Sequence, residues 1–352
     1  MSKSVAILTG GGDAPGLNAV IRAVVKYGAG RLGWRIVGVE DSFNGLLERP
    51  FRVRELTPIS CKGILGRGGT ILGTTNHGDP FAFPDGRGHD ADRSRELRDA
   101  LVEVGVEGVI VVGGDGTMRI SRKLMEVHGI KVVGVPKTID NDLGATDVTF
   151  GFQSAVDCAT DALDRLHTTA ESHDRVLVLE VMGRDAGWIA LHAGVSGGAD
   201  CIVLPEIPWR AERLAAKLEE RQAKGSAFSL IVVAEGAKPL GEPPGGKIVP
   251  GRAAQAVADA IAKVLPKVET RITVLGHLQR GGSPVAYDRM LATRFGVGAV
   301  DLVAQGRWGE LVRIKDGVVD GVPLLAADVN RTVDPDGDLV RVARAVGVEF
   351  GG

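Results

Sequence analysis

The segment 136–142, with the sequence PKTIDND, brings a cation, a hydroxyl group and two carboxylates close together. It follows the apolar run 132–135, where a buried strand should end, and open α/β sheets bind ligands at the carboxyl ends of their strands. Asp140 and Asp142 could divide the work, one removing a proton and the other helping to hold a metal ion. Lys137 would suit a phosphate group as a point charge. A capped turn with solvated acids is the structural alternative.

Two glycine-rich segments follow other apolar runs. GGGDAPG spans residues 10–16, and GGDGT spans residues 113–117. Glycine lets the backbone come close to a phosphate group, and the N-terminus of a following helix favours negative charge. The first segment lacks the ending of a Walker loop and matches the dinucleotide pattern poorly, so a tight turn without a ligand is its alternative. Asp115 in the second segment could bind Mg²⁺ directly or through water.

The scaffold that must position these residues is predicted to be α/β. Short runs of β-branched and aliphatic residues recur, as is typical of strands covered on both faces. Amphipathic segments alternate with them, which implies right-handed βαβ units and mainly parallel sheets. The expected strands are 5–8, 36–39, 108–112, 132–135, 176–181, 201–204, 230–233 and 272–275, and the expected helices are 19–30, 93–104, 155–169, 210–224 and 251–264.

A chain of 352 residues suggests about two domains, and eight or more strands fit two sheets better than one. We place the join near Gly151 and a return crossing near Leu278. The prediction is two Rossmann-like three-layer α/β domains with mainly parallel sheets. One comprises residues 1–150 plus about 279–329, and the other comprises about 151–278 plus 330–352.

Charge and composition exclude several classes of protein. A net charge of −2 argues against an electrostatic footprint for nucleic acid. Cys61, Cys158 and Cys201 are isolated, without metal-ligand or redox spacing, and suit the reduced thiols of a cytosolic protein. No apolar run approaches the ~20 residues that cross a bilayer, and the N-terminus lacks a signal-peptide core. We expect a soluble cytoplasmic protein with no nucleic-acid or membrane partner.

Five segments in this order resemble the motifs of the phosphofructokinase family. The resemblance extends from about residue 5 to residue 301 and implies phosphorylation of fructose 6-phosphate to fructose 1,6-bisphosphate, with Mg²⁺ as cofactor and ATP as the donor that we favour. The five segments are GGDAPGLN at 11–18, GGDGT at 113–117, TIDND at 138–142, VMGR at 181–184 and LGHLQRGG at 275–282.

The resemblance also implies a role for each matching residue. Asp140 would be the base that takes the proton from the 1-hydroxyl group of the sugar, and Thr138 would contact the transferred phosphoryl group. Asp115 and Asp142 would associate with Mg²⁺, the first directly and the second through water. The domain of residues 1–150 plus about 279–329 would bind the donor, and its site would include Gly11, Asn76, Gly114, Gly116 and Thr117. The other domain would be the fructose 6-phosphate domain, and the sugar phosphate would be held by Met182, Gly183, Arg184, Glu235, His277 and Arg280.

Two further arginines imply an oligomer. Arg175 and Arg271 match arginines with which a neighbouring subunit contacts the 6-phosphate, and planar guanidinium groups suit that phosphate because they can bind it with two hydrogen bonds. We therefore expect a homo-oligomer, and specifically a tetramer. A surface ion pair is the alternative for each arginine.

The chain departs from the family pattern at the donor site. Pyrophosphate-dependent members typically carry Asp and Lys at the positions of Gly116 and Lys137, whereas ATP-dependent members typically carry Gly at both. A side chain at 116 would crowd and repel the α-phosphate of a nucleotide, so Gly116 favours ATP. Asn76 stands where many bacterial ATP-dependent members have an arginine, and Lys137 is our candidate for the missing charge. Pyrophosphate as donor is the first alternative.

The basic cluster that binds effectors in well-known bacterial members is reduced here. His167 stands where arginine is usual, and the segment 224–228 lacks lysines after its glycine, so we expect a weak or absent response to ADP and phosphoenolpyruvate. An NAD or lipid kinase would explain GGDGT but neither Asp140 nor the segment 277–282. A non-catalytic sensor on this fold would usually have lost the base or a metal-binding acid, whereas Asp115, Asp140 and Asp142 are all present.

Overall fold

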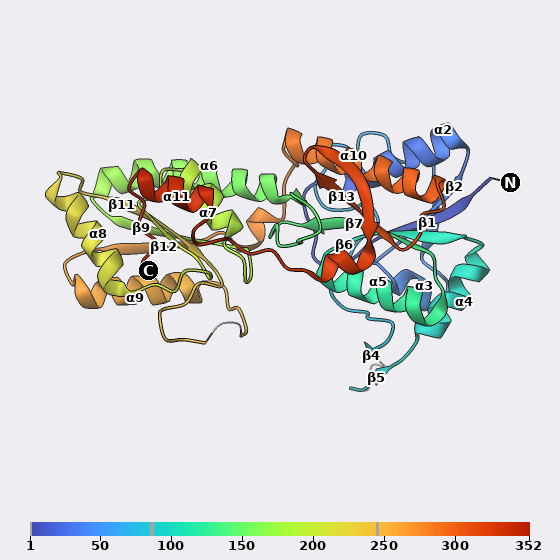
Figure 1. Cartoon of the computed structure of the whole chain (residues 1–352), viewed down its shortest axis with the longest axis horizontal. Helices are drawn as coiled ribbons and strands as arrows, with labels where there is room; N and C mark the ends of the chain where they lie inside the picture. The colour runs from blue at the N-terminus through green and yellow to red at the C-terminus, as the bar shows by residue number, and fades with distance from the viewer. Residues whose placement is uncertain (1, 85–87, 244–245) are drawn as a thin grey trace. The chain divides into compact units, whose positions relative to one another are not determined.

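The computed structural model describes residues 2–84, 88–243 and 246–352, and the chain forms two compact units (Figure 1). That one unit binds the phosphoryl donor and the other the sugar phosphate stays a prediction. Unit 1 consists of Met1–Thr138, Leu143–Gly151 and Arg280–Asn330, and unit 2 consists of Ile139–Asp142, Phe152–Gln279 and Arg331–Gly352.

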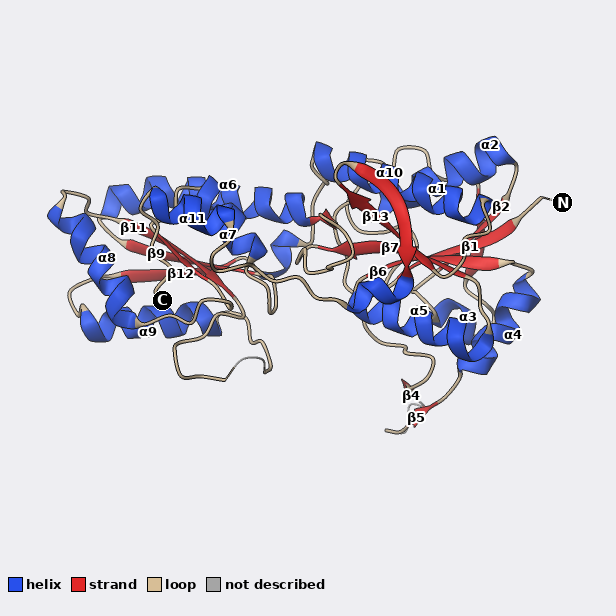
Figure 2. Ribbon diagram, viewed as in Figure 1, coloured by secondary structure: helices blue, strands red, loops and turns tan. Residues whose placement is uncertain are grey.

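Unit 1 is built on an eight-stranded sheet (Figure 2). Its strands are, in order across the sheet, β14 (Val318–Pro323), β13 (Glu310–Lys315), β7 (Val132–Thr138), β6 (Gly108–Gly113), β1 (Ser4–Thr9), β2 (Arg35–Val39) and β3 (Val53–Leu56), with β8 (Phe150–Gly151) paired to β7. The central strands are parallel, and the edge strands β3 and β14 are antiparallel to their neighbours. The short strands β4 (Phe83–Pro84) and β5 (Asp90–Ala91) pair separately.

Helices cover both faces of this sheet, because alternate residues of its central strands point to opposite sides. Ile7 and Ile110 belong to the core beneath α1 (Leu17–Val24) and α10 (Ala286–Ala304), whereas Leu8 and Val111 belong to the core on the other face. That second core includes α3 (Asn44–Leu47), α4 (Ser94–Val104) and α5 (Asp115–His128). The remaining elements of unit 1 are the π-helical segment η1 (Val25–Ala29), α2 (Gly30–Leu32) and the 3-10 helix η3 (Leu324–Asp328).

Unit 2 is built on a four-stranded parallel sheet in the order β10 (Cys201–Val203), β11 (Ser229–Ala234), β9 (Val176–Val181) and β12 (Thr270–Val274). One face packs on α8 (Ala211–Ala223) and α9 (Arg252–Val264), through a core that contains Val178 and Ile231. The other face is covered by α6 (Phe152–His173) and α7 (Trp188–Ser196). The 3-10 turn η2 (Gly276–Gln279) follows β12, and α11 (Asp338–Ala345) lies near the chain end.

The predicted fold class is confirmed, because both units are α/β with mainly parallel sheets. Each of the eight expected strands overlaps a strand of these two sheets, and each of the five expected helices overlaps a helix. The elements that were not predicted include the helices α3, α5, α7, α10 and α11, the strands β3 and β8 and the hairpin β13–β14. Across the described residues, the helices are all too short or too polar to span a membrane.

Candidate active site

The first glycine segment leaves the carboxyl end of β1 and is held by backbone hydrogen bonds. Gly10 N–H donates to the carbonyl of Val112 at the end of β6 (2.9 Å), and Gly11 N–H donates to the carbonyl of Thr75 (3.0 Å). The Thr74 hydroxyl donates to the carbonyl of Gly11 (2.6 Å). Asn76, a predicted donor-site residue, is exposed and is the next residue after Thr75 in the sequence. The residues 74–76 and the glycine loop therefore lie side by side.

The second glycine segment connects β6 to α5, and Thr117 explains its glycines. A Cβ atom at Gly113 would lie 2.5 Å from Thr117 Cβ, and one at Gly10 would lie 2.8 Å from Thr117 Cγ2. No side chain fits at either place, so both loops approach Thr117 as bare backbone. Asp115 is the first residue of α5, and this end of a helix attracts anions.

Gly116 lies beside open space. A Cβ atom there would have Arg119 Nη2, at 3.9 Å, as its nearest neighbour apart from its own chain neighbours and helix backbone. The glycine is therefore not required by packing within unit 1, unlike Gly113. The space suits a ligand group at the N-terminus of α5, and a carboxylate placed there would repel a bound anion.

Lys137 supplies a cation to the first glycine segment. The lysine is near the end of β7 and only 3% exposed, and its Nζ donates a hydrogen bond to the carbonyl of Gly12. Nζ would also be 3.6 Å from a Cβ atom at Gly11. A buried ammonium group at this distance is well placed to attract a phosphate bound on the loop.

The carboxylate of Asp115 in unit 1 fits a Mg²⁺ ion that binds together with a phosphate ligand. Asp115 is one-third exposed, and its carboxylate lies 3.5 Å from Arg119 Nη2. The described part of the chain contains no group of three or more His, Cys, Asp or Glu side chains that could hold a metal ion. Mg²⁺ usually binds one or two carboxylates together with substrate phosphates and water, and it is seldom bound by protein ligands alone.

The loop Ile139–Asp142 is part of unit 2, where it accompanies Glu235. Asp140 is only 4% exposed, and Asn141 adopts a left-handed backbone conformation (φ 56°). Glu235 follows β11, and its carboxylate accepts hydrogen bonds from the backbone N–H groups of Arg184 (3.0 Å) and Gly183 (3.3 Å). Burial raises the pKa of Glu235, and the charge of Asp140 raises it further.

The predicted sugar-phosphate residues of unit 2 meet at the carboxyl edge of its sheet. Met182 directly follows β9, and its N–H donates to the side-chain oxygen of Gln279 (2.8 Å). Gln279 is buried and also donates to the carbonyl of Ala155 (3.4 Å). Arg184 is exposed with a positive φ of 53°, and His277 is exposed on η2. The two motifs 181–184 and 275–282 are thus joined by Gln279.

Arg280 belongs to unit 1, where it lies on the first glycine segment. Its Nη1 donates to the carbonyl of Asp13 (3.0 Å), and a Cβ atom at Gly12 would be 2.6 Å from the same nitrogen. Gly12 must therefore remain without a side chain for Arg280 to take this position. Within its own unit, this arginine accompanies the predicted donor residues.

Arg175 and Arg271 lie at the opposite end of the unit 2 sheet. Arg175 immediately precedes β9, and Arg271 is paired in register with Leu177 near the start of the same strand. Both arginines form ion pairs with Glu269, Arg175 at 3.2 Å. Since β9 has six residues, about 20 Å separates them from the edge where Met182 and Glu235 lie.

Three residues with structural links to this site were not predicted. Gln279 could have been found, because it lies inside the motif that contains His277 and Arg280. Glu206 and Arg331 are far from every motif in sequence, and no pattern in the chain marks them. Glu206 accepts hydrogen bonds from the N–H groups of Gly187 (2.9 Å) and Val333 (2.8 Å), and Arg331 contacts the Asp140 loop, as described below.

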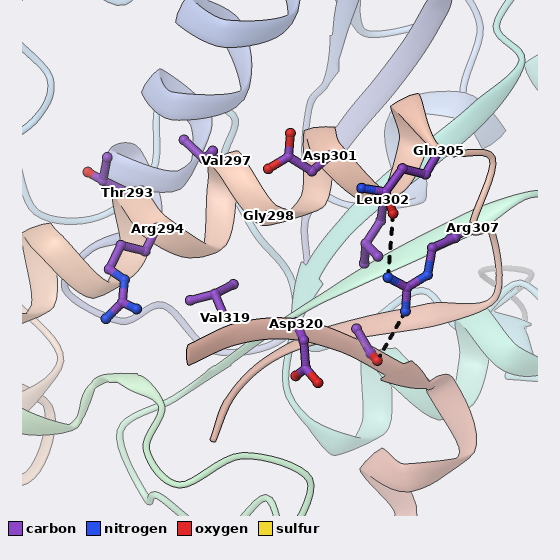
Figure 3. Close-up of a pocket in the computed structure, with 11 residues that line it drawn as sticks. Thr293, Arg294, Val297, Gly298, Asp301, Leu302, Gln305, Arg307, Val319 and Asp320 are labelled. Carbon is purple, nitrogen blue, oxygen red and sulfur yellow. Dashed lines mark hydrogen bonds between the residues drawn. The ribbon is translucent and has the colours of Figure 1, made fainter. Parts of the chain in front are cut away.

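A separate pocket with a volume of about 430 Å³ lies in unit 1 between α10 and β14 (Figure 3). Its two arginines are bonded to the β13–β14 hairpin: Arg294 donates to the carbonyl of Gly317 (2.5 Å) and Arg307 to that of Gly321 (3.3 Å). None of the predicted donor or sugar-phosphate residues lines this pocket.

Comparison with known proteins agrees with the five motifs. A family model for phosphofructokinase matches residues 4–303. The chain is 52% identical over 355 residues to the ATP-dependent 6-phosphofructokinase of Chloroflexus aurantiacus, with 99% of this chain and 97% of that protein covered.

Solved structures with the same fold include two phosphofructokinases. The enzyme from Saccharomyces cerevisiae matches with a TM-score of 0.81 and 31% identity, over 93% of this chain but 45% of the yeast chain. The pyrophosphate-dependent phosphofructokinase from Nitrosospira multiformis matches with a TM-score of 0.81 and 22% identity, over 100% of this chain and 93% of that one. This second match shows a common fold. The predicted resemblance is confirmed: this chain belongs to the phosphofructokinase family.

Proposed function

We propose that this protein transfers the γ-phosphoryl group of ATP to the 1-hydroxyl group of fructose 6-phosphate, forming fructose 1,6-bisphosphate in glycolysis. Membership of the phosphofructokinase family supports the reaction. The open space at Gly116, beside the N-terminus of α5, is the observation that supports a nucleotide as the donor. The 52% identical relative is likewise named an ATP-dependent enzyme.

The donor is held by unit 1 in this proposal. Backbone N–H groups near Gly11 and Gly114 and the end of α5 at Thr117 cradle its phosphates, with Asn76 beside them. Lys137 and Thr138 contact the transferred phosphoryl group. Asp115 would hold Mg²⁺ directly, and Asp142, from the loop Ile139–Asp142, would do so through water. When bound, Mg²⁺ neutralises negative charge on the phosphates. Phosphoryl transfer depends mainly on such positioning and charge stabilisation.

The acceptor is held by unit 2 in this proposal. Asp140 removes the proton of the 1-hydroxyl group, for which general-base assistance contributes about 10²–10⁴-fold. Glu235 fixes the backbone of Gly183 and Arg184. The sugar phosphate is bound by Met182, Gly183, Arg184, Glu235 and His277, and Arg280 is the sixth residue that we propose to bind it.

The sugar site is completed by a neighbouring subunit. Arg175 and Arg271 share Glu269 at the edge of the sheet opposite Met182, which supports their action on another protomer's 6-phosphate. We propose a homo-oligomer, specifically a homotetramer, that acts in the cytoplasm. Glu269 holds the two guanidinium groups together when no phosphate is bound.

Pyrophosphate is the second candidate donor, and Lys137 is the observation that favours it. The lysine is typical of pyrophosphate-dependent relatives and is fixed at the glycine segment through Gly12. Neutralising a transferred phosphoryl group is useful with either donor, however, so the open space at Gly116 keeps ATP as the first candidate.

A donor comparison tests the proposal. The purified chain is assayed with fructose 6-phosphate and Mg²⁺, with either ATP or pyrophosphate, and fructose 1,6-bisphosphate is measured directly. We expect product with ATP and little with pyrophosphate. Product with pyrophosphate alone would overturn the donor assignment, and no product with either would overturn the reaction. Assays without Mg²⁺ and with a chelator are the control.

A further inference from the structure

Arg331 contacts the loop that carries Asp140, although no sequence motif includes it. Its backbone N–H donates to the carbonyl of Asp142 (2.7 Å). Its guanidinium group donates to the carbonyl of Asn141 through Nη2 (3.2 Å) and Nε (3.3 Å). Main chain and side chain of one residue thus bond to two successive carbonyls that directly follow Asp140.

The carbonyl that the guanidinium group binds belongs to a residue in an unusual conformation. Asn141 has a φ of 56° and is 5% exposed. A left-handed conformation is costly for residues other than glycine, although asparagine tolerates it better than most, and it persists where surrounding contacts determine it. A charge-assisted hydrogen bond to the Asn141 carbonyl is such a contact.

Arg331 is itself held in place by α7. Its guanidinium carbon lies 4.8 Å from the ring centre of Trp188, and the Trp188 indole N–H donates to the Arg331 carbonyl (3.1 Å). Two residues further on, Val333 N–H donates to the Glu206 carboxylate, which also receives the N–H of Gly187. The arginine is therefore fixed before any ligand binds, which lowers the entropic cost of holding the loop.

We propose that Arg331 is a positioning residue for phosphoryl transfer: by binding the Asn141 carbonyl, it holds the carboxylate of Asp140 in the orientation that proton removal requires. The inference rests on the proposed function, since it assigns Arg331 to the base of that reaction. Arg331 acts through the backbone of the loop: it orients the base and does not itself contact the substrate.

This role predicts an effect on turnover and little effect on affinity. Loss of Arg331 leaves the sugar-binding residues Met182 and Glu235 with their own hydrogen bonds, so the KM for fructose 6-phosphate should change little. A base displaced by about 1 Å, by contrast, can cost about a hundredfold in rate. A merely structural role would lower the folded fraction and leave the kcat of the folded protein unchanged.

The test compares Arg331→Ala and Arg331→Lys with a matched control, Arg344→Ala. Arg344 also belongs to the C-terminal part of unit 2, donates to a backbone carbonyl (Pro335, 3.4 Å) and lies over an aromatic ring (Phe350, 5.5 Å). For each variant, kcat, KM and thermal unfolding are measured with the intact chain, and turnover is expressed per folded protein. Guanidinium ion is then added at millimolar concentration to both alanine variants.

For Arg331→Ala we expect kcat to fall about ten- to a hundredfold while KM stays within about threefold of the wild type. Lysine, which keeps the charge but loses the planar fork, should restore part of kcat. Guanidinium should raise the turnover of Arg331→Ala and not that of Arg344→Ala. Equal kcat values for Arg331→Ala and the control would overturn the inference. An inactive wild type would instead overturn the proposed function.

Discussion

The ammonium group of Lys137 donates a hydrogen bond to the backbone carbonyl of Gly12. This bond joins the end of β7 to the loop after β1, and β6, which lies between those two strands, carries the second glycine segment. The side chain is 3% exposed, so its charge is weakly screened by solvent. Lys137 therefore places a buried positive charge beside the two glycine segments, which we propose bind the phosphates of the donor.

Replacing Lys137 with glycine should lower turnover far more than nucleotide affinity. The lysine is expected to act on the transferred phosphoryl group, and removing one charge-stabilising donor typically costs about a hundredfold in kcat. Lys131→Gly is the matched control, because Lys131 lies just before the same strand and pairs with Glu107 (3.1 Å). Steady-state kinetics and nucleotide titration are the measurements, and an unchanged kcat would exclude the assigned role.

Asp140→Asn should separate a catalyst from a sensor. Without the base we expect kcat to fall by about 10²–10⁴-fold, while fructose 6-phosphate still binds. Calorimetric titration with the sugar phosphate measures the binding. Asp147→Asn removes an exposed partner of Lys315 (3.1 Å) and provides the control. If Asp140→Asn retained wild-type turnover, another residue would have to be the base.

Gly116→Asp should raise the KM for ATP by at least about tenfold, because its carboxylate would project into open space beside the helix end and repel a nucleotide phosphate. Gly116→Ala adds bulk without charge and so separates the two effects. Because the nearest neighbour of its Cβ, Arg119 Nη2, lies at 3.9 Å, we expect little change in the stability of the free protein and a modest rise in the KM for ATP. Kinetics with ATP and with pyrophosphate measure both variants. An unchanged KM for ATP in Gly116→Asp would contradict the inference that Gly116 makes room for a nucleotide.

The pH dependence of stability should reflect Glu235, whose pKa burial raises above the ordinary value of 4.5. Between 4.5 and the raised value, the folded protein binds a proton that the unfolded chain has lost, so this residue's contribution to stability falls as pH rises through that window. Glu235→Gln should flatten that part of the profile and raise stability at neutral pH, while weakening sugar binding. Urea unfolding across the window is the measurement, and an unaltered slope would contradict the assignment.

Mixed oligomers test whether the arginines act between subunits. Arg271→Ala and Asp140→Asn proteins should each be nearly inactive. After they are unfolded and refolded together, some sites would combine an intact Asp140 with a neighbour's intact Arg271 and recover activity. Mixing Asp140→Asn with Asp140→Ala is the control, which should stay inactive. Failure to recover activity in demonstrated hybrid oligomers would place Arg271 in its own protomer's site or in none.

Much of the scaffold could be predicted because buried parallel strands are apolar on both faces. Val111, for example, lies in a run whose neighbours point alternately into two cores. The helix α10 was missed because apolar residues also occur on its outward face, among them the exposed Tyr287 and Met290. The amphipathic pattern is therefore weak in the sequence, although the buried residues line one face of the helix. The hairpin β13–β14 could have been found, since the residues Asp316 and Gly317 between its strands are a common hairpin signal.

The candidate site was predictable where motifs carry it and not where distant contacts do. Asp140 and Gly116 lie in recognisable segments, whereas Arg331 is 190 residues from Asn141 and its partner is a backbone carbonyl. A carbonyl is present in every residue and leaves no trace in sequence. That the loop Ile139–Asp142 is part of unit 2 is likewise a matter of packing, which one sequence does not reveal.

The division of the chain also bears on how such proteins can be recombined. Unit 2 is encoded in three separate stretches, and one of them is only the four residues Ile139–Asp142. A chimaera made with a single crossover between two relatives, anywhere between residues 142 and 331, would combine the loop of one parent with the Arg331 of the other. Shuffled genes should therefore keep activity most often when both stretches are inherited from the same parent.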